Sequence, residues 1–149
     1  RSSFNVGSLF RTADCFGLEA LYLSGFSPSP LNPKLKKTAL GAEKEVLWQK
    51  ESSLEKLITR FKKQGKIIYA LETTDTAKSS LNFKFEKNAS FLIGNERLGL
   101  APDALSLAGE VVKIPMQGSK SSLNVSLATA CIVHEYLRQH FFIRNKIII

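Results

Sequence analysis

Residues 112–126, with the sequence VKIPMQGSKSSLNVS, have the composition of a loop that holds a ligand. A short apolar run, Val111 to Ile114, ends at a proline, and a stretch rich in Gly and Ser then leads into a helical pattern. The backbone N–H groups of such a stretch can approach a ligand closely. Asn124 and Ser126 fall at the start of the helix, where the N-terminus favours anions and polar ligands. Because ligands of open α/β sheets bind where a strand ends, these residues predict a binding site.

Two earlier segments have a similar character. Residues 5–13 read NVGSLFRTA, and residues 93–100 read IGNERLGL. In the first, Arg11 lies among the apolar positions of a helical pattern, which is unusual for Arg unless the residue is paired or functional. In the second, Gly94 follows an apolar run and has no side chain that would block a close approach of the backbone. Both segments are therefore candidates for the same site.

The charge of the chain indicates a polyanionic partner. Lys and Arg total 21 against 13 Asp and Glu, which gives a net charge of +8, and nucleic acid is the leading candidate for such a basic domain. Zinc-finger spacing, a basic zipper and an aromatic RNP motif are absent from the sequence. The two cysteines, Cys15 and Cys131, lie in helical patterns without the further ligands that a metal needs. We expect them to be small buried thiols, and we expect no metal site.

Apolar periodicity divides the chain into alternating helices and strands. Helices are expected over residues 6–16, 33–40, 53–63, 101–107 and 123–142. Strands are expected over residues 20–23, 46–48, 67–71, 89–93 and 111–114. The runs 67–71 and 89–93 are continuously apolar, as in strands that are buried on both faces. This alternation predicts an α/β fold with a largely parallel sheet, in a single domain over residues 1–149.

The ends of the first helix carry their own signals. Asn5 stands where an N-cap residue would, and Gly17 follows the helix as a C-terminal stop. No segment is long and apolar enough to cross a membrane, and we find no secretory signal. We therefore expect a cytoplasmic protein.

The three motifs, in their order and spacing, resemble the signature motifs of the SpoU (TrmH-like) RNA methyltransferases of the SPOUT superfamily. The third motif, residues 114–126, is the most specific, and the resemblance covers nearly the whole chain. It implies an α/β domain with a mostly parallel sheet flanked by helices and a C-terminal trefoil knot. It also implies a homodimer whose active site uses residues of both subunits.

The resemblance further implies a reaction, the transfer of a methyl group from S-adenosylmethionine to a ribose 2′-hydroxyl of tRNA or rRNA. The product of the cofactor would be S-adenosylhomocysteine. Six residues are thereby assigned to cofactor binding: Leu71, Gly94, Ile114, Met116, Ser122 and Leu123. Five are assigned to catalysis: Arg11, Asn5, Glu96, Asn124 and Ser126. Arg11 is expected either to deprotonate the hydroxyl or to bind its phosphate, and a guanidinium, with a pKa above about 12, is better suited to the second role.

The sequence also departs from the family pattern. Members usually begin with a strand before the Asn of the first motif, so we expect the first strand of the domain to be missing before Asn5. Ser121 stands where many members carry an acid. Each site residue also has a structural interpretation, with Asn5 as a helix cap, Glu96 as a structural carboxylate and Arg11 as a salt-bridge partner.

Two other functions compete with methyl transfer. The first is a non-catalytic RNA-binding protein on the same scaffold, which the intact residues of the three motifs argue against. The second is a generic nucleotide-binding α/β domain, which the absence of a GxGxxG motif and of a P-loop argues against.

Overall fold

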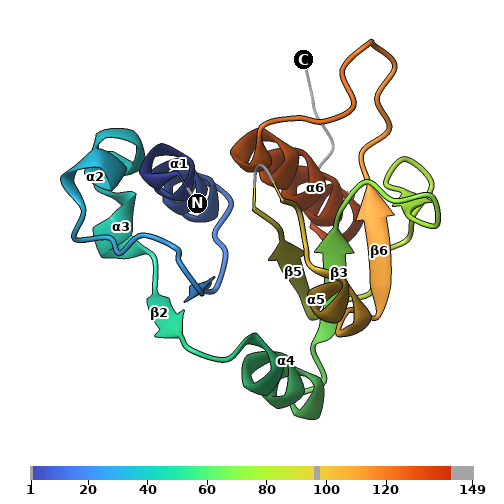
Figure 1. Cartoon of the computed structure of the whole chain (residues 1–149), viewed down its shortest axis with the longest axis horizontal. Helices are drawn as coiled ribbons and strands as arrows, with labels where there is room; N and C mark the ends of the chain where they lie inside the picture. The colour runs from blue at the N-terminus through green and yellow to red at the C-terminus, as the bar shows by residue number, and fades with distance from the viewer. Residues whose placement is uncertain (1, 96–97, 142–149) are drawn as a thin grey trace.

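The computed structural model describes residues 2–95 and 98–141, drawn as a cartoon in Figure 1. The helices are α1 (Ser3–Cys15), α2 (Pro33–Ala39), α3 (Ala42–Glu45), α4 (Leu54–Lys63), α5 (Pro102–Ser106) and α6 (Val125–His140). The strands are β1 (Leu21–Ser24), β2 (Trp48–Glu51), β3 (Ile67–Leu71), β4 (Lys78–Ser79), β5 (Ala89–Ile93) and β6 (Glu110–Lys113). The expected alternation of helices and strands is confirmed.

The larger sheet has the order β4-β6-β3-β5, and every strand pair in it is parallel. Ile67 pairs with Ala89 and Leu71 with Ile93, so the two continuously apolar runs lie side by side along their full length. Because the strands are parallel, their carboxyl ends lie at one edge of the sheet, as Figure 1 shows for β3, β5 and β6. The loops that leave this edge contain the second and third sequence motifs.

Helices cover both faces of this sheet, and strand β3 shows how the sequence achieves it. Tyr69 points toward α6, where it packs in a core with Ile132 and Val133. Its neighbour Ile68 points to the other face and packs against Leu57 of α4. Successive residues of a strand face opposite sides, so a strand that is covered on both faces must be apolar throughout.

Helix α6 is also tied to the loop ahead of β5 through its last turn. Gln139 accepts a hydrogen bond from the Phe85 N–H at 2.9 Å and donates one to the Phe83 carbonyl at 2.8 Å. Glu135 accepts from both Gln139 and Arg138, and the hydrogen bonds from the Arg138 guanidinium are 2.7 and 2.8 Å long. This guanidinium lowers the pKa of Glu135 from 4.5 to about 2.

A second unit contains the smaller sheet, in which β1 and β2 are parallel, together with α1, α2 and α3 (Figure 1). Its core includes Val6 and Phe10 of α1 and Leu35 of α2, all of them fully buried. The two helices meet at Gly7, where an added Cβ would lie 2.2 Å from both the Leu35 carbonyl oxygen and the Thr38 hydroxyl. Glycine is therefore required for the close approach of α1 and α2.

Three expectations from the sequence are wrong in detail. Helix α1 begins at Ser3 with Ser2 in the N-cap position, so Asn5 lies inside the helix and is not its cap. Cys15 and Cys131 are exposed, because the buried positions of α1 and α6 form stripes that leave both thiols on the outer sides. Strand β2 begins at Trp48, two residues later than expected. Gly17 does follow α1 as a stop, with a φ of +62°.

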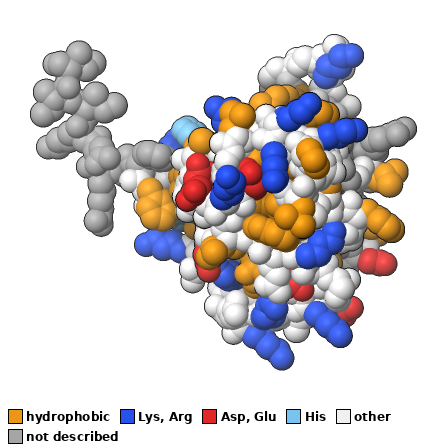
Figure 2. Space-filling model, turned by 90° about the vertical axis from the view of Figure 1, so that its left-hand side faces the viewer, with side chains coloured by type: hydrophobic (Ala, Val, Ile, Leu, Met, Phe, Trp, Pro, Cys, Tyr) orange, Lys and Arg blue, Asp and Glu red, His pale blue; other side chains and the backbone are white. Residues whose placement is uncertain are grey.

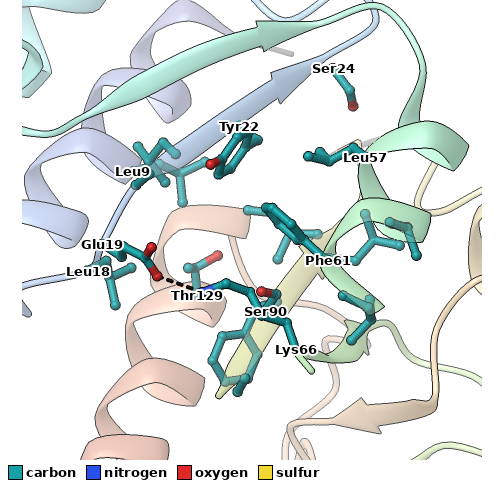
Figure 3. Close-up of a pocket in the computed structure, with 18 of the residues that line it drawn as sticks. Leu9, Leu18, Glu19, Tyr22, Ser24, Leu57, Phe61, Lys66, Ser90 and Thr129 are labelled. Atoms are coloured by element: carbon teal, nitrogen blue, oxygen red, sulfur yellow. Dashed lines mark hydrogen bonds and ion pairs between the residues drawn. The ribbon is translucent and has the colours of Figure 1, made fainter. Parts of the chain in front are cut away.

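A groove separates the two sheets (Figure 3). Its sides are the edges of β1 and β5, which pair only with β2 and β3 in the part of the chain that the structure describes. Leu9 of α1 and Val133 of α6 line one wall, and Leu57 and Phe61 of α4 line the other. The cavity between them has a volume of about 240 Å³.

An ion pair joins the two units beside this groove. Lys66, just ahead of β3, lies 2.6 Å from the Glu19 carboxylate, just ahead of β1 (dashed in Figure 3). Within the described residues, no helix has both the length and the apolar composition needed to span a membrane.

Candidate functional site

A cavity of about 450 Å³ lies at the carboxyl edge of the larger sheet. The loops that follow β3, β5 and β6 form it together with the first turn of α6. All six residues that the sequence assigns to cofactor binding line this one cavity: Leu71, Gly94, Ile114, Met116, Ser122 and Leu123. They come from segments up to about fifty residues apart in the chain, and parallel pairing of β3 with β5 and β6 brings them together.

The lining suits a ligand with both apolar and polar parts. Apolar side chains from the ends of the three strands make up much of the wall, and Asn95, Thr73 and Thr74 add polar groups. Its volume lies within the range of about 300–1,000 Å³ that is usual for sites of small ligands and cofactors. The cavity therefore has a size and a mixed lining that are usual for sites of small ligands and cofactors.

Gly94 has to be a glycine because the backbone at Gly99 and Leu100 packs directly against it. An added Cβ would lie 2.4 Å from the Gly99 carbonyl carbon and 2.7 Å from the Leu100 nitrogen. Asn95 and Gly99 also exchange two backbone hydrogen bonds, of 3.0 and 2.8 Å, which close the loop on itself. The missing side chain thus lets the loop fold back against the end of β5 and form one wall of the cavity.

Sequence reasoning missed Glu72, which directly follows β3 and lines the same cavity. Its carboxylate accepts hydrogen bonds from the Leu100 N–H at 2.8 Å and from the Thr73 N–H at 3.0 Å. It thereby connects the loop after β3 to the loop after β5. The one signal in the sequence was the position of Glu72 directly after a buried strand, at the edge where ligands of open α/β sheets bind.

The N-terminus of α6 carries two of the residues assigned to catalysis. Asn124 caps the helix by accepting hydrogen bonds from the Ser126 N–H at 2.9 Å and from the Ser126 hydroxyl at 2.6 Å. The Asn124 amide also donates to the Asn5 side-chain oxygen at 3.0 Å. Asn5, Asn124 and Ser126 are therefore brought together in one hydrogen-bonded chain, beside the first cavity.

Arg11 lines a second cavity, of about 410 Å³, between α1, α2 and α6. Ser126 lines this cavity as well, while its neighbour Val125 lines the first, so the start of α6 separates the two. Arg11 is exposed and lies on the side of α1 opposite to the buried stripe. Glu96, the remaining residue assigned to catalysis, lies outside the described residues.

Comparison with known proteins shows a family match over most of the chain. Residues 1–134 match the model of the SpoU rRNA Methylase family. Over 135 residues, the chain is 32% identical to the tRNA (guanosine(18)-2′-O)-methyltransferase of Thermus thermophilus, covering 91% of this chain and 69% of that protein. The Escherichia coli enzyme of the same name is 30% identical, over 91% of this chain and 58% of its own length.

A solved structure has the same fold. The SpoU methyltransferase AviRb from Streptomyces viridochromogenes, in complex with AdoMet, superposes with a TM-score of 0.86 at 27% identity. The match covers 95% of this chain and 57% of AviRb, so the chain spans little more than half of that protein. Such SpoU neighbours imply the knotted SPOUT fold that the sequence motifs predict. With its second and third motifs at one sheet edge and a family match over residues 1–134, the chain belongs to the SpoU rRNA methylase family.

Proposed function

We propose that this protein transfers a methyl group from S-adenosylmethionine to a ribose 2′-hydroxyl of tRNA or rRNA. One observation carries the proposal: six residues that the family resemblance assigns to the cofactor line a single cavity at the carboxyl edge of a parallel sheet. The Thermus and Escherichia coli relatives are named as tRNA 2′-O-methyltransferases, and the AviRb structure contains AdoMet. The excess of Lys and Arg suits an RNA substrate.

The cavity residues would hold the cofactor through both apolar contacts and backbone groups. Leu71, Ile114 and Leu123 offer apolar surface for the adenine, and the loop around Gly94 offers backbone groups for the polar parts. When bound, S-adenosylmethionine supplies a methyl group on a sulfonium, which the ribose oxygen receives as the sulfur leaves. The role of the protein is to orient the ribose oxygen in line and to help remove its proton.

Arg11 supplies the charge for the RNA side of the reaction. Its guanidinium would bind a phosphate next to the target ribose through paired hydrogen bonds. The same positive charge lowers the pKa of a nearby 2′-hydroxyl, because it stabilises the alkoxide more than the neutral group. Asn124 and Ser126 lie at the N-terminus of α6, and Asn5 of α1 is hydrogen-bonded to Asn124, so that these three polar side chains would orient the ribose.

Calorimetric titration of the purified protein with S-adenosylmethionine tests the first half of this function. We expect micromolar binding near one site per chain. Radiolabelled methyl transfer to unmodified tRNA and rRNA transcripts tests the second half, and a 2′-O-methyl product is recognised by the resistance of its phosphodiester to alkali. A folded protein that binds RNA but not S-adenosylmethionine would instead be the non-catalytic RNA-binding protein.

We also propose that the protein acts as a homodimer. Leu127 of α6, 58% exposed, and Leu40 at the end of α2, 66% exposed, lie around the mouth of the Arg11 cavity. A second copy packed on this apolar rim would complete the outer wall of that cavity. Sedimentation at micromolar concentration should give a dimer, and Leu127→Glu should give a monomer. Leu81→Glu, a change at a leucine that is 74% exposed and does not line this cavity, is the control and should leave the dimer intact.

Finally, we propose that the first strand of this catalytic domain belongs in the groove between β1 and β5. Both sides of the groove are strand edges and both walls are apolar, as a central parallel strand requires. The hydrogen bond from Asn124 to Asn5 ties the start of α1 to the start of α6, which follows the carboxyl edge of the sheet. A strand that leads into α1 from this edge would run parallel to β5 and form a strand–helix–strand unit with β1.

A fused segment tests this placement. A five-residue segment of Val and Ile, equal in length to β5, is joined ahead of Arg1, and a segment of Ser and Asn serves as the control. The apolar segment should raise the melting temperature and slow amide exchange in residues 21–24 and 89–93. Equal exchange with both segments would contradict the placement.

A further inference from the structure

The Arg11 cavity has a polar wall that the α1 sequence builds at helical spacing. Ser8, Arg11, Thr12 and Cys15 line the cavity from α1, and the last three stand three, four and seven residues after Ser8. These residues share one face of the helix, opposite the stripe that is buried in the core. The cavity is thus lined on this side by hydroxyl groups around a single guanidinium.

Helix α2 supplies a second cation to the same cavity. Lys37 lines it together with Thr38 and Leu40. The position of α2 is fixed, because the Thr38 hydroxyl donates to the Phe4 carbonyl of α1 at 2.7 Å and the helices touch at Gly7. Lys37 is the residue next to this contact, so its backbone is held on the wall that faces α1.

The electrostatics of this cavity favour an anion. None of the described residues that line it is acidic, and no salt bridge within the described part of the chain involves Arg11 or Lys37. Figure 2 views the molecule from the side of α2 and α3 and shows Lys and Arg side chains spread across this face, more of them than acidic ones. The protein carries a net charge of +8, so its basic side chains outnumber its acidic ones over the whole sequence.

We propose that Lys37 is a second phosphate-binding residue, which acts with Arg11 on the RNA backbone in this cavity. This inference rests on the proposed function only in taking RNA as the polyanion. Arg11 and Lys37 would bind phosphate in different ways. A planar guanidinium can hold two phosphate oxygens at once, whereas an ammonium acts as a point charge that tolerates several backbone positions. The hydroxyls of Ser8, Thr12 and Ser126 add neutral donors around the same space.

The sequence offers a matched control for Lys37. Lys36 is its neighbour in the last turn of α2, it is also exposed, and it does not line the cavity. Lys36→Gln and Lys37→Gln remove the same charge from the same turn of the same helix. Any difference between the two variants therefore reports on the cavity and not on net charge or on the helix dipole.

The experiment measures binding of a fluorescein-labelled 20-nucleotide uridine RNA as a function of salt concentration. Each phosphate contact to a single strand contributes about 0.7 to the slope of log affinity against log salt concentration. Lys37→Gln should lower this slope by about 0.7 and weaken binding roughly tenfold at low salt. Lys36→Gln should change affinity less than about twofold and leave the slope unchanged, and Lys37→Arg should restore the slope.

Equal effects of Lys36→Gln and Lys37→Gln would overturn the inference, because they would show that only the diffuse charge of α2 matters. The readout needs no methyl transfer, so it stands apart from the proposed function. Calorimetry with S-adenosylmethionine on the same variants separates the two, since both variants should bind the cofactor as the unchanged protein does. If the unchanged protein did not bind the cofactor while Lys37→Gln still lowered the salt slope, the methyltransferase proposal would fail and the phosphate site would stand.

Discussion

Asn124 donates a hydrogen bond to Asn5 at 3.0 Å, which joins the first and last helices across 119 positions of the chain. The same Asn124 side chain caps α6 through its oxygen, so its two ends have separate tasks. The oxygen stabilises the helix terminus, and the amide fixes the position of α1 relative to it. This division allows the structural and the functional contributions of one residue to be measured separately.

Asn124→Asp should keep the cap and lose the contact with Asn5. The aspartate still accepts from the Ser126 N–H, and Asp caps helices about as well as Asn. The melting temperature should therefore change little, while methyl transfer falls at least tenfold because Asn5 loses its donor. Asn124→Ala, which loses both functions, should destabilise the fold by about 1 kcal/mol. Full methyl transfer by Asn124→Asp would show that the contact between the two asparagines does not serve the reaction.

Arg11→Ala should abolish methyl transfer and leave the affinity for S-adenosylmethionine nearly unchanged. The reason is spatial, because Arg11 lines the cavity between α1, α2 and α6 and not the cavity at the sheet edge. Single-turnover methylation and calorimetry measure the two quantities. Arg138→Ala, at an arginine near the opposite end of α6, is the control and should keep its activity. Methyl transfer by Arg11→Ala at the unchanged rate would remove Arg11 from the catalytic assignment.

Gly94→Ala should damage the cofactor cavity. The new methyl group would meet the backbone at Gly99 and Leu100, which cannot move without opening the loop. Overpacking of this kind costs about 1–3 kcal/mol, and we expect at least tenfold weaker binding of S-adenosylmethionine. Gly118→Ala is the matched control, because nothing lies within 4 Å of the added atom. Calorimetry measures the affinity of both variants for S-adenosylmethionine. Equal affinities would refute the role of Gly94.

Glu135→Gln should make the stability of the fold less sensitive to a fall in pH. The folded pKa of Glu135 is about 2, below its ordinary value of 4.5, so its ionised form stabilises the native state. This stabilisation is fully present above about pH 4.5 and is lost as the pH falls from there toward 2. The variant should therefore melt at a lower temperature than the unchanged protein at pH 7, and the difference should shrink below pH 4. A difference that stays constant from pH 7 to pH 3 would contradict this assignment.

The bounds of strands β3 and β5 were predicted to the residue. A strand that is covered on both faces is apolar at nearly every position, so the ends of the apolar run mark the ends of the strand. The six residues that the sequence assigns to cofactor binding do line one cavity at one edge of the sheet, since parallel pairing follows from the alternation of helices and strands. The start of α1 was missed because Asn5 has the local chemistry of a cap but is recruited by Asn124, a partner far away in the chain. Glu72 was missed for a similar reason, because its partner Leu100 belongs to another loop.

The break between the two sheets has a consequence for how the molecule unfolds. No strand pair within the described residues connects β1 and β2 to the larger sheet, and the buried clusters around Val6 and around Tyr69 share only Leu18, which is partly buried and packs against both. The unfolding of two such units is less cooperative, because either unit can open without breaking the hydrogen bonds between the strands of the other. Native-state hydrogen exchange should then show a lower opening free energy for β1 and α2 than for β3. A sheet made continuous by a strand in the groove would merge these two openings into a single transition.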